Sequence, residues 1–410
     1  MDKKNIAVLG TGTAGILAIC HMLSYLSDDY EIYSISDPGI PSVGIGESTN
    51  PVFWNSMWKC LGISKEDIFK NNQIDATIKY GTLYKNWRKQ DFLNPLFGEG
   101  THSAVHFNTF KIKDFVFNII KAKYFGRFQE LYGTVNDIEN LANCVNVSVN
   151  GESKLFDYVI DCRGFPKDNM DNYNIVDLPL NHGLIHNIEQ ESEYDEWGYT
   201  LHQATTDGWM FGVPLTKRIS YGYLFNDTVT DTITAKSNFA NLINVDVKDI
   251  QDIEYKFRSY FAKKLINGRI ILNGNASVFF EPMFANSLWL YDYNNRLIFD
   301  FITGTNTSVN DINYKFYIKV KAVHDLICFY YQGGSNYDTE FWNKAKNYAS
   351  KCLKNSRLMC EIDNMFDFMK KSGLKLTTHD HQYISPYSVD SLQKLDSFLG
   401  YNRWNLTEKN

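Results

Sequence analysis

Apolar positions near the start of the chain form two short runs with a helical pattern between them. Residues 6–9 are apolar, and a glycine-rich turn separates them from apolar residues at helical spacing. A second run, residues 30–36, is rich in β-branched and aromatic side chains and predicts another strand. The order strand, helix, strand predicts a parallel sheet at the start of the chain.

Later segments add a strand and a helical region. The segment DGWMFGVP places Trp209 and Phe211 two positions apart, the spacing of residues on one face of a strand. The segment KAVHDLICFYYQGG has apolar residues at helical spacing and predicts a packing helix that ends at Gly333. Residues 301–410 are mainly helical in pattern, without a Pro/Ser-rich linker, so we expect them to pack on the rest.

Composition and charge exclude several classes of protein. The 410 residues are 44% hydrophobic with 9 prolines, which permits a large core. An apolar run of about eighteen residues, as a membrane helix needs, does not occur, so we expect a soluble protein. The 7 cysteines are odd in number and lack CxxC pairs, which indicates reduced thiols in a cytoplasm. A net charge of −6 with scattered lysines gives no support for nucleic-acid binding.

The sequence also gives little support for a bound metal. Two histidines in the segment HDH, His379 and His381, are the nearest approach to a ligand pair. At this spacing and without carboxylate support, they are more often surface polar residues than metal ligands. We therefore predict no metal.

The glycine-rich turn has the GxGxxG spacing of a dinucleotide site. Gly10 would permit the tight turn, Gly12 would let the backbone approach a pyrophosphate, and Gly15 would let helix and strand pack closely. Thr13 and Ala14 would then lie at the helix N-terminus, where the phosphates bind. The position between strand and helix favours a dinucleotide site over a merely tight turn.

The second strand ends where an acidic residue usually meets the ribose hydroxyls. Here the strand ends at Ser36, with Asp37 one residue beyond. Either side chain could accept that hydrogen bond, and the spacing does not decide between them. A second glycine fingerprint does not appear later in the sequence, which favours a flavin supplied with electrons from elsewhere.

The next segment, PSVGIGESTNP at residues 41–51, would by itself be interpreted as a turn with a helix cap. Together with GxGxAG, it resembles the flavin-dependent tryptophan halogenase family, whose members carry a GxGE(A/S)TxP segment against the flavin. Further matches occur in the family's order: LGI (61–63), NWRK (86–89), HFN (106–108), DYVIDCRGF (157–165), GWMFGVP (208–214), GYLF (222–225), GNASVFFEP (274–282) and DTEFW (338–342). The compact, Lys/Asn-rich chain also resembles viral members of the family from cyanophages.

This resemblance implies an FAD-binding, glutathione-reductase-like α/β fold with a parallel sheet, an antiparallel substrate-side sheet and a mainly helical C-terminal part. Residues 1–300 would form the FAD-binding body with interleaved substrate-side segments. The resemblance further implies reduced FAD from a separate flavin reductase, O2, a halide ion and an aromatic small-molecule substrate. The flavin contacts that it implies beyond the glycine turn are Glu47, Ser48, Val135 and Asn275.

The segment GWMFGVP resembles a relaxed form of the family's WxWxIP signature. Trp209 and Pro214 are kept, and Phe211 takes the second aromatic place. In the family this signature lines the space between flavin and substrate. The alternative is that Trp209 and Phe211 are simply two aromatic rings on one face of a sheet.

In the family, hypohalous acid formed with the flavin's help reaches a lysine beside the substrate. Two alignments compete for that lysine. Matching AxIK in NNQIDATIKY to the family places Asp75 there, whereas counting back seven residues from NWRK gives Lys79. We prefer Lys79, because NWRK is the longer match and because the chemistry needs an amine.

A second departure from the family lies in the segment EPMFANSLW. Phe284 stands where the family has a glutamate that assists the lysine, so another acid, for which Asp75 is the candidate, would have to replace it. Asn286 and Ser287 stand where Thr-Gly amides hold chloride in the family. The altered halide cradle leads us to expect bromide or iodide to be favoured over chloride.

Two other functions stay open at this stage. The missing glutamate favours a flavin-dependent monooxygenase or oxidase, whereas Trp209, Phe211, Pro214 and Lys79 oppose it. A flavin-binding protein without catalytic activity is the other alternative.

Overall fold

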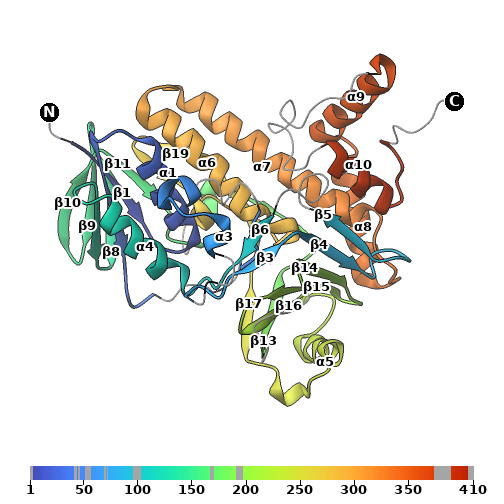
Figure 1. Ribbon diagram of the computed structural model, residues 1–410. Coiled ribbons are helices and arrows are strands. Elements are labelled where there is room, and N and C mark those ends of the chain that lie inside the picture. Colours follow the sequence, from blue (N-terminus) through green and yellow to red (C-terminus); the bar gives the residue numbers. More distant parts are fainter. Residues whose placement is uncertain are drawn as a thin grey trace. The chain divides into compact units, whose positions relative to one another are not determined.

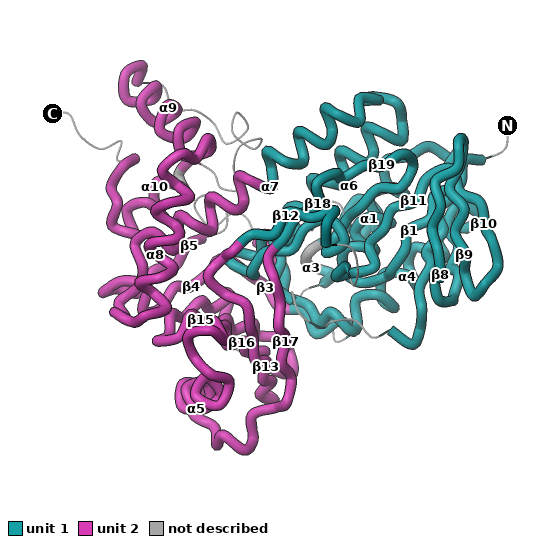
Figure 2. Tube along the Cα trace, turned by 180° about the vertical axis from the view of Figure 1, so that it is seen from behind, with its two compact units in different colours: residues 1–76, 105–176, 260–320 teal, residues 77–104, 177–259, 321–410 magenta. Residues whose placement is uncertain are grey.

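Figure 1 shows the computed structural model, which describes residues 3–40, 44, 47–50, 57–68, 71, 73–95, 103–166, 170–190, 197–373 and 389–404. The chain divides into two compact units, each assembled from three segments (Figure 2). Unit 1 comprises residues 1–76, 105–176 and 260–320, and unit 2 comprises residues 77–104, 177–259 and 321–410. The helical part expected at 301–410 is therefore shared, because the division falls within helix α7 (Val309–Gln332).

Unit 1 is built on a mostly parallel six-stranded sheet with the order β19-β20-β11-β1-β2-β7. β1 pairs in parallel with both β11 and β2, and only the short β19 runs antiparallel to its neighbour within this sheet. The strands are β1 (Lys4–Leu9), β2 (Tyr30–Ser36), β7 (Phe128–Tyr132), β11 (Tyr158–Asp161), β19 (Ile266–Asn267) and β20 (Ile270–Leu272).

A small antiparallel sheet and several helices pack on these strands. Ala7 and Leu9 of β1 share a buried apolar cluster with Val145 and Val147 of the small sheet, because alternate residues of a strand point to one face. Helix α1 packs against β1, β2 and α6 (Figure 1). The remaining elements of unit 1 are β8 (Val135–Asn140), β9 (Val145–Val149), β10 (Glu152–Phe156), β12 (Tyr173–Val176), β18 (Ser259–Ala262), β21 (Val278–Phe279), α1 (Thr13–Tyr25), α3 (Lys65–Ile68), α4 (Ile112–Lys123) and α6 (Asn286–Thr303).

Unit 2 is built on a seven-stranded sheet with the order β17-β13-β16-β15-β14-β4-β5. All neighbours run antiparallel except β14 and β4, which are parallel. The strands are β4 (Gly81–Lys85), β5 (Phe92–Pro95), β13 (His182–Glu189), β14 (Tyr199–Ala204), β15 (Gly208–Pro214), β16 (Arg218–Phe225) and β17 (Ile253–Lys256). Two further short strands in the chain are β3 (Thr77–Lys79) and β6 (Ala104–His106).

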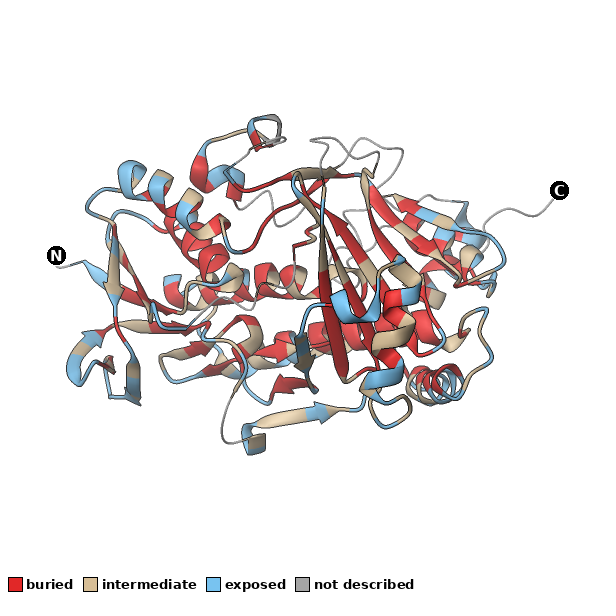
Figure 3. Cartoon of the chain, turned by 90° about the horizontal axis from the view of Figure 1, so that it is seen from below, coloured by how far each residue is buried: buried red, intermediate tan, exposed pale blue. Residues whose placement is uncertain are grey.

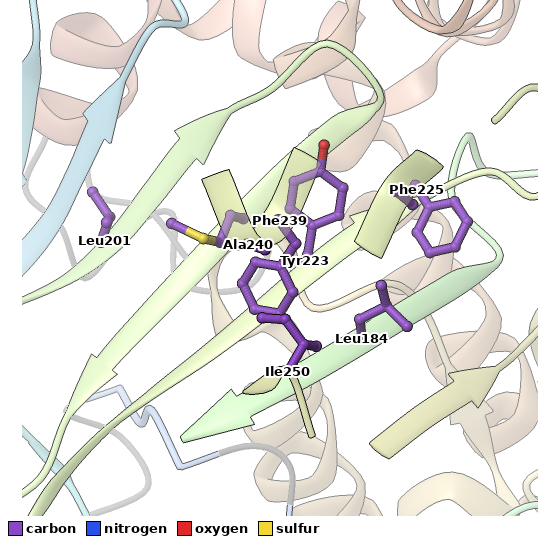
Figure 4. Packing of buried hydrophobic residues seen from close by; sticks show 9 residues of the cluster. Leu184, Leu201, Tyr223, Phe225, Phe239, Ala240 and Ile250 are labelled. Carbon is purple, nitrogen blue, oxygen red and sulfur yellow. The ribbon is translucent and has the colours of Figure 1, made fainter. Parts of the chain in front are cut away.

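One face of this sheet is covered by helix α5 (Thr232–Ile243). Tyr223 of β16 stacks on Phe239 of α5 with ring centroids 5.3 Å apart (Figure 4). Met210 of β15 belongs to the same buried cluster. Because strand residues alternate, Trp209 and Phe211 must lie on the opposite face of β15. Trp209 and Phe211 therefore share one face of the strand, as their spacing in the sequence predicted.

The remaining helices of unit 2 are α8 (Glu340–Leu353), α9 (Arg357–Ser372) and α10 (Val389–Phe398). Arg88 of the NWRK segment joins the ends of two of the helices. Its guanidinium donates to the carbonyl of Gly334 just after α7 (2.9 Å) and to that of Leu399 just after α10 (3.0 and 2.8 Å). The motif used to align the chain thus has a structural task.

These observations confirm the predicted fold class, with a parallel sheet, an antiparallel sheet and a helical C-terminal region. Buried residues run through the strands of both main sheets (Figure 3). The helix predicted to end at Gly333 ends at Gln332 but begins at Val309, well before the predicted segment. All 7 cysteines lie in the described part and are free thiols. Within the described ranges, the helices are too short or too polar for any of them to cross a membrane.

Asp207 precedes β15, and its carboxylate accepts hydrogen bonds from Tyr223 (2.5 Å), Asn238 (2.8 Å) and Thr230 (3.1 Å). The substitution Asp207→Ala should lower the free energy of unfolding by about 3 kcal/mol, because it leaves buried donors unpaired. Urea denaturation measures this change. The exposed Asp252 provides the control, since Asp252→Ala should leave the midpoint nearly unchanged. Equal midpoints for the two variants would contradict the role given to Asp207.

Candidate active site

The glycines of the turn after β1 are of two kinds, those without room for a side chain and one with room for it. Gly10 has φ +86°, and a Cβ there would lie 2.8 Å from the carbonyl oxygen of Cys162. A Cβ on Gly15 would lie 2.0 Å from the carbonyl oxygen of Gly10. At Gly12, in contrast, a Cβ would meet no heavy atom within 4 Å. The fold itself therefore requires Gly10 and Gly15, whereas Gly12 leaves an open space in front of the turn.

Helix α1 begins directly behind this open space. Gly12 is its N-cap and, having no side chain, makes no side-chain cap hydrogen bond. The first N–H groups of a helix, here those of Thr13 and Ala14, lack partners within the helix and carry its positive dipole end. This helix end suits the negative charge of a pyrophosphate, so the residues present suit a dinucleotide such as FAD.

Asn275 lies in the short 3₁₀ turn η3 (Gly274–Ala276), which packs on the first turn of α1. Gly274 has φ +60°, and a Cβ there would lie 2.5 Å from the Cβ of Ala14. The side-chain oxygen of Asn275 accepts a hydrogen bond from the Tyr291 hydroxyl, and its carbonyl accepts one from Tyr260 (2.6 Å). The structure thus brings Asn275 beside the glycine turn, with its amide nitrogen as the side-chain group that can donate to a ligand.

The residues expected near the ribose and adenine lie at the end of β2. The carbonyl of Ser36 accepts a hydrogen bond from the backbone N–H of Gly133 (3.0 Å), close to the start of β8 at Val135. The carboxylate of Asp37 accepts a hydrogen bond from Thr134 (2.5 Å) and another from the backbone two residues on. Ser36 thus lies against the turn that leads into β8 at Val135, and the carboxylate of Asp37 is already engaged in its own turn.

Glu47 and Ser48 are held by the HFN segment. Ser48 forms an isolated β-bridge with His106, and the carbonyl of Glu47 accepts a hydrogen bond from the N–H of Phe107 (3.0 Å). Both segments belong to unit 1 together with the glycine turn. Much of PSVGIGESTNP, namely residues 41–43, 45, 46 and 51, lies outside the described residues, as does the HDH segment.

Asp75 is a buried residue of unit 1 in the left-handed region, with φ 49°. Its carboxylate forms a salt bridge with Lys111 (2.7 Å) and accepts a hydrogen bond from Asn108 (3.1 Å). Asp75 and Lys79, the two candidates of the competing alignments, belong to different units. The surroundings of Asp75 are therefore those of unit 1, and the surroundings of Lys79 are those of unit 2.

The segment expected to hold the halide forms a tight turn before α6. Phe284 and Ala285 both adopt left-handed conformations, with φ 49° and 53°. The side-chain amide of Asn286 donates to the carbonyls of Glu281 (2.7 Å) and Met283 (3.0 Å) and so fixes this turn. The first N–H groups of α6 follow at once, and such groups favour an anion.

Ser287 connects this turn with the flavin side of unit 1. Its hydroxyl is hydrogen-bonded to Tyr291, one turn later on α6, and the Tyr291 hydroxyl donates to Asn275. Burial raises the pKa of Tyr291 well above its ordinary value, so this hydroxyl keeps its proton. The halide segment and the η3 turn are therefore linked by neutral hydrogen-bonding groups.

Lys79 is the last residue of β3 in unit 2, and its side chain is almost completely buried. Burial lowers the pKa of the amine to about 7, because the low-dielectric surroundings disfavour the charged form. The hydroxyl of Thr77, two residues earlier, donates to the carbonyl of Pro214 (2.6 Å). The strand that carries Lys79 is thus held against the end of the GWMFGVP segment.

His202 of β14 is a neighbour of Lys79 that the sequence analysis missed. Burial, reinforced by the positive charge of Lys79, lowers the pKa of His202 to about 3. Its ring lies 4.7 Å from that of Trp209. A single histidine in an alternating strand is too common a pattern to identify, so only the three-dimensional arrangement shows this contact.

Three tryptophans from three separate motifs surround β14. The indole N–H of Trp87 donates to the carbonyl of His202 (3.2 Å), and that of Trp209 donates to the hydroxyl of Tyr331 on α7 (3.0 Å). The indole of Trp342 donates to the backbone of the turn that follows β14 (2.7 Å). NWRK, GWMFGVP and DTEFW therefore meet in one aromatic cluster in unit 2.

Phe211 differs from Trp209 in its surroundings. It is half-buried, and its ring lies over Gly222 of β16, where a Cβ would come within 2.1 Å of the ring. Trp209 is fully buried within the aromatic cluster. The two aromatic residues of the signature thus share a sheet face, but only Trp209 is enclosed.

Comparison with known proteins finds one family over most of the chain. The family model described as tryptophan halogenase matches residues 5–114 and 96–367. The chain is 20% identical over 363 residues to tryptophan 7-halogenase KtzQ of Kutzneria sp. (strain 744), which covers 70% of this chain and 67% of that protein. It is 19% identical over 424 residues to tryptophan 6-halogenase ThaL of Streptomyces albogriseolus, covering 84% and 79%.

A solved structure shares the fold of the whole chain. BrvH, a flavin-dependent halogenase from Brevundimonas sp. BAL3, superposes with a TM-score of 0.77 at 16% sequence identity. The alignment covers 97% of this chain and 90% of that one. The fold is therefore similar from end to end, although few residues are identical.

The two kinds of glycine can be separated by mutation. Gly12→Val should abolish FAD binding while leaving the protein folded, because its side chain would fill only the open space where the pyrophosphate would bind. Gly15→Val should instead destabilise the protein itself, because its Cβ would collide with the backbone of Gly10. Fluorescence titration with FAD and thermal unfolding measure the two effects. Unchanged FAD affinity in Gly12→Val would place the pyrophosphate elsewhere.

Proposed function

The chain belongs to the tryptophan halogenase family, and we propose that, as a flavin-dependent halogenase, it halogenates an aromatic small molecule through Lys79. The observation that carries this proposal is the buried amine of Lys79, with its pKa lowered to about 7 by burial. An amine that is neutral near physiological pH can bind electrophilic halogen through its lone pair.

The glycine turn and the N-terminus of α1 would hold the FAD pyrophosphate, with Asn275 beside them. Bound reduced FAD, together with O2, supplies the oxidising power that turns a halide into hypohalous acid. A separate flavin reductase would provide the reduced FAD, since only one glycine fingerprint occurs in the sequence. Ser36, Glu47, Ser48 and Val135 are the further flavin contacts that we propose.

The neighbours of Lys79 keep its amine in a dry and neutral environment. His202 carries no charge at neutral pH, because its pKa lies near 3. The ring of His202 lies against the buried ring of Trp209, with ring centroids 4.7 Å apart, and Thr77 fixes the strand of Lys79 through Pro214. A neutral amine protected from water would pass its halogen to an aromatic ring instead of losing it to hydrolysis.

Asp75 is our candidate for the carboxylate that replaces the family's glutamate. Its bonds to Lys111 and Asn108 fix the chain four residues before Lys79, so we propose that it acts as a positioning residue. Asp75→Asn should then reduce the yield of halogenated product without shifting the pH at which the yield is half-maximal.

The chief alternative is a flavin-dependent monooxygenase or oxidase, which the phenylalanine at position 284 favours. An electron-rich phenol, supplied with reduced FAD and O2, distinguishes the two functions. Incorporation of the halide supports the halogenase, whereas hydroxylation that is independent of halide supports the monooxygenase.

We predict that Lys79→Met lowers halogenated product by about 100-fold or more while reduced FAD and O2 are still consumed. The variant should also be more stable. The folded pKa of about 7 lies below the unfolded value of about 10.4, so the wild-type amine destabilises the fold below about pH 7 and does so less as pH rises to 10.4. Removing it should raise the free energy of unfolding at pH 7 by on the order of 3 kcal/mol.

Product analysis by mass spectrometry and urea denaturation measure the two effects of Lys79→Met. Lys85→Met, on the neighbouring strand β4, is the control and should retain product formation. In the wild type, product per reduced FAD consumed should rise with pH around 7. Undiminished product from Lys79→Met would show that free hypohalous acid, and not this amine, halogenates the substrate.

The halide prediction follows from the turn before α6. Chloride is the most strongly hydrated of the three usable halides and depends most on amide donors to replace its lost water. Bromide and iodide lose their water more easily and are polarisable enough to contact the ring of Phe284. We predict that bromide or iodide is preferred in competition assays with equimolar halides.

A variant tests the part played by the ring. Phe284→Gly keeps the left-handed backbone without strain and removes the apolar contact, so it should raise the chlorinated share of the product. Wild-type protein that forms mainly chlorinated product would contradict the predicted preference. It would indicate that the amides of Asn286 and Ser287 form an equivalent cradle.

A further inference from the structure

Unit 2 contains a cluster of metal-ligating side chains that the proposed halogenation does not use. His324 and Cys328 lie one turn apart on α7, and Cys352 lies near the end of α8. One nitrogen of the histidine and the two sulfur atoms all lie within 4.8 Å of one another. His324 and Cys328 are buried, and Cys352 is half-buried.

The distances fit a tetrahedral metal site. Ligand distances of about 2.3 Å for Zn–S and about 2.1 Å for Zn–N place sulfur and nitrogen about 3.6 Å apart at a tetrahedral angle. The Sγ of Cys328 lies 3.7 Å from the Nε2 of His324. Two thiolates and an imidazole form a ligand set that zinc prefers over harder cations such as Mg²⁺.

A second observation concerns the orientation of the histidine. Its other ring nitrogen, Nδ1, lies 2.8 Å from a carboxylate oxygen of Asp325, and the second oxygen of Asp325 accepts a hydrogen bond from Ser356 (2.6 Å). A carboxylate on the outer nitrogen of a metal-binding histidine fixes the tautomer in which Nε2 offers its lone pair. The same arrangement would hold Nε2 toward Cys328.

The sulfur of Cys352 faces both other members of the cluster, since Cys352 is hydrogen-bonded with Cys328 and His324. Cysteine binds a metal as the thiolate, so binding of the ion would release protons.

We propose that His324, Cys328 and Cys352 form a structural site for a borderline-soft divalent cation, with zinc as the expected ion. The fourth ligand would be a water molecule, and the hydroxyl of Tyr348 lies 3.1 Å from Nε2. The ion joins α7 to α8, and Asp325 extends the connection to the N-cap of α9 at Ser356.

This site has a mechanical consequence for the aromatic cluster. Cys328 lies three residues before Tyr331, whose hydroxyl accepts the indole hydrogen bond of Trp209. A metal at Cys328 would therefore stabilise the part of α7 that supports Trp209. It would contribute to stability and would take no part in the halogenation itself.

Cobalt substitution in the reduced, tag-free, full-length protein tests the proposal. One equivalent of Co²⁺ should produce a thiolate-to-cobalt charge-transfer band and the intense visible bands of a tetrahedral ion. Zinc should displace the cobalt and remove these bands. Chelation of the zinc-loaded protein should lower its thermal unfolding temperature.

Single substitutions distinguish the proposed metal ligands from residues that do not bind the metal. Cys328→Ser and Cys352→Ser should each lose the charge-transfer intensity of one thiolate and bind zinc more weakly. Cys360→Ser, which removes an exposed thiol of α9, should bind like the wild type. Asp325→Asn should keep both thiolates but weaken zinc binding about 10- to 100-fold.

Several results would overturn the proposal. These are wild-type protein that gives no thiolate band with Co²⁺, a full band that survives in both cysteine variants, and a Cys328–Cys352 disulfide in freshly purified metal-free protein. Circular dichroism of each variant shows whether a loss of binding comes from unfolding. The wild-type titration decides the matter even if a variant does not fold.

Discussion

The burial of the Lys79 amine is the constraint on which the arrangement of unit 2 depends. A charged ammonium group away from water destabilises a fold by several kcal/mol unless it is paired. Burial lowers the pKa of Lys79 to about 7 and that of its neighbour His202 to about 3, so His202 is neutral and Lys79 is only partly charged at physiological pH. Nearby, the indole N–H of Trp209 donates to the hydroxyl of Tyr331, whereas the buried Nδ1 of His202 makes no hydrogen bond within the described part of the chain. The same burial is the basis of the reactivity that we propose for this amine.

In unit 1 the main constraint is the close approach of backbone segments around the glycine turn. Gly10, Gly15 and Gly274 are placed where a Cβ would strike another part of the turn, so the path of the chain dictates these residues. Gly12 borders the open space in which we propose that the pyrophosphate binds. The fold resembles that of BrvH over 97% of the chain at only 16% identity.

The sequence predicted the features that depend on local order. The strand and helix around the glycine turn, the strand at 208–214 and the helix end before Gly333 all follow from periodicity and turn residues. The division into units could not be predicted in this way, because each unit is assembled from three distant segments. Helix α7 begins at Val309, inside the region 301–410 that the pattern predicted to be mainly helical, although the segment singled out as a packing helix began only at Lys321.

The candidate sites could likewise be predicted from the sequence only where their residues belong to motifs. Motif order made Lys79 and Trp209 candidates, because family motifs are read along the chain. His202 was missed, since its importance comes from lying next to both of them on another strand. The cluster of His324, Cys328 and Cys352 was missed for a related reason. A histidine and a cysteine four positions apart become neighbours only when the segment is known to be a helix, and Cys352 comes from the next helix.

The turn before α6 shows how a departure from a family pattern can be accommodated physically. Left-handed conformations at Phe284 and Ala285 are unfavourable by roughly 1–2 kcal/mol each for residues with a Cβ. They persist because Asn286 donates to two carbonyls of the same turn and because α6 begins immediately afterwards. Strained residues of this kind cluster where a fold must present backbone groups in one direction. The strained conformations of Phe284 and Ala285 are therefore held by the turn that leads directly into the first amides of α6.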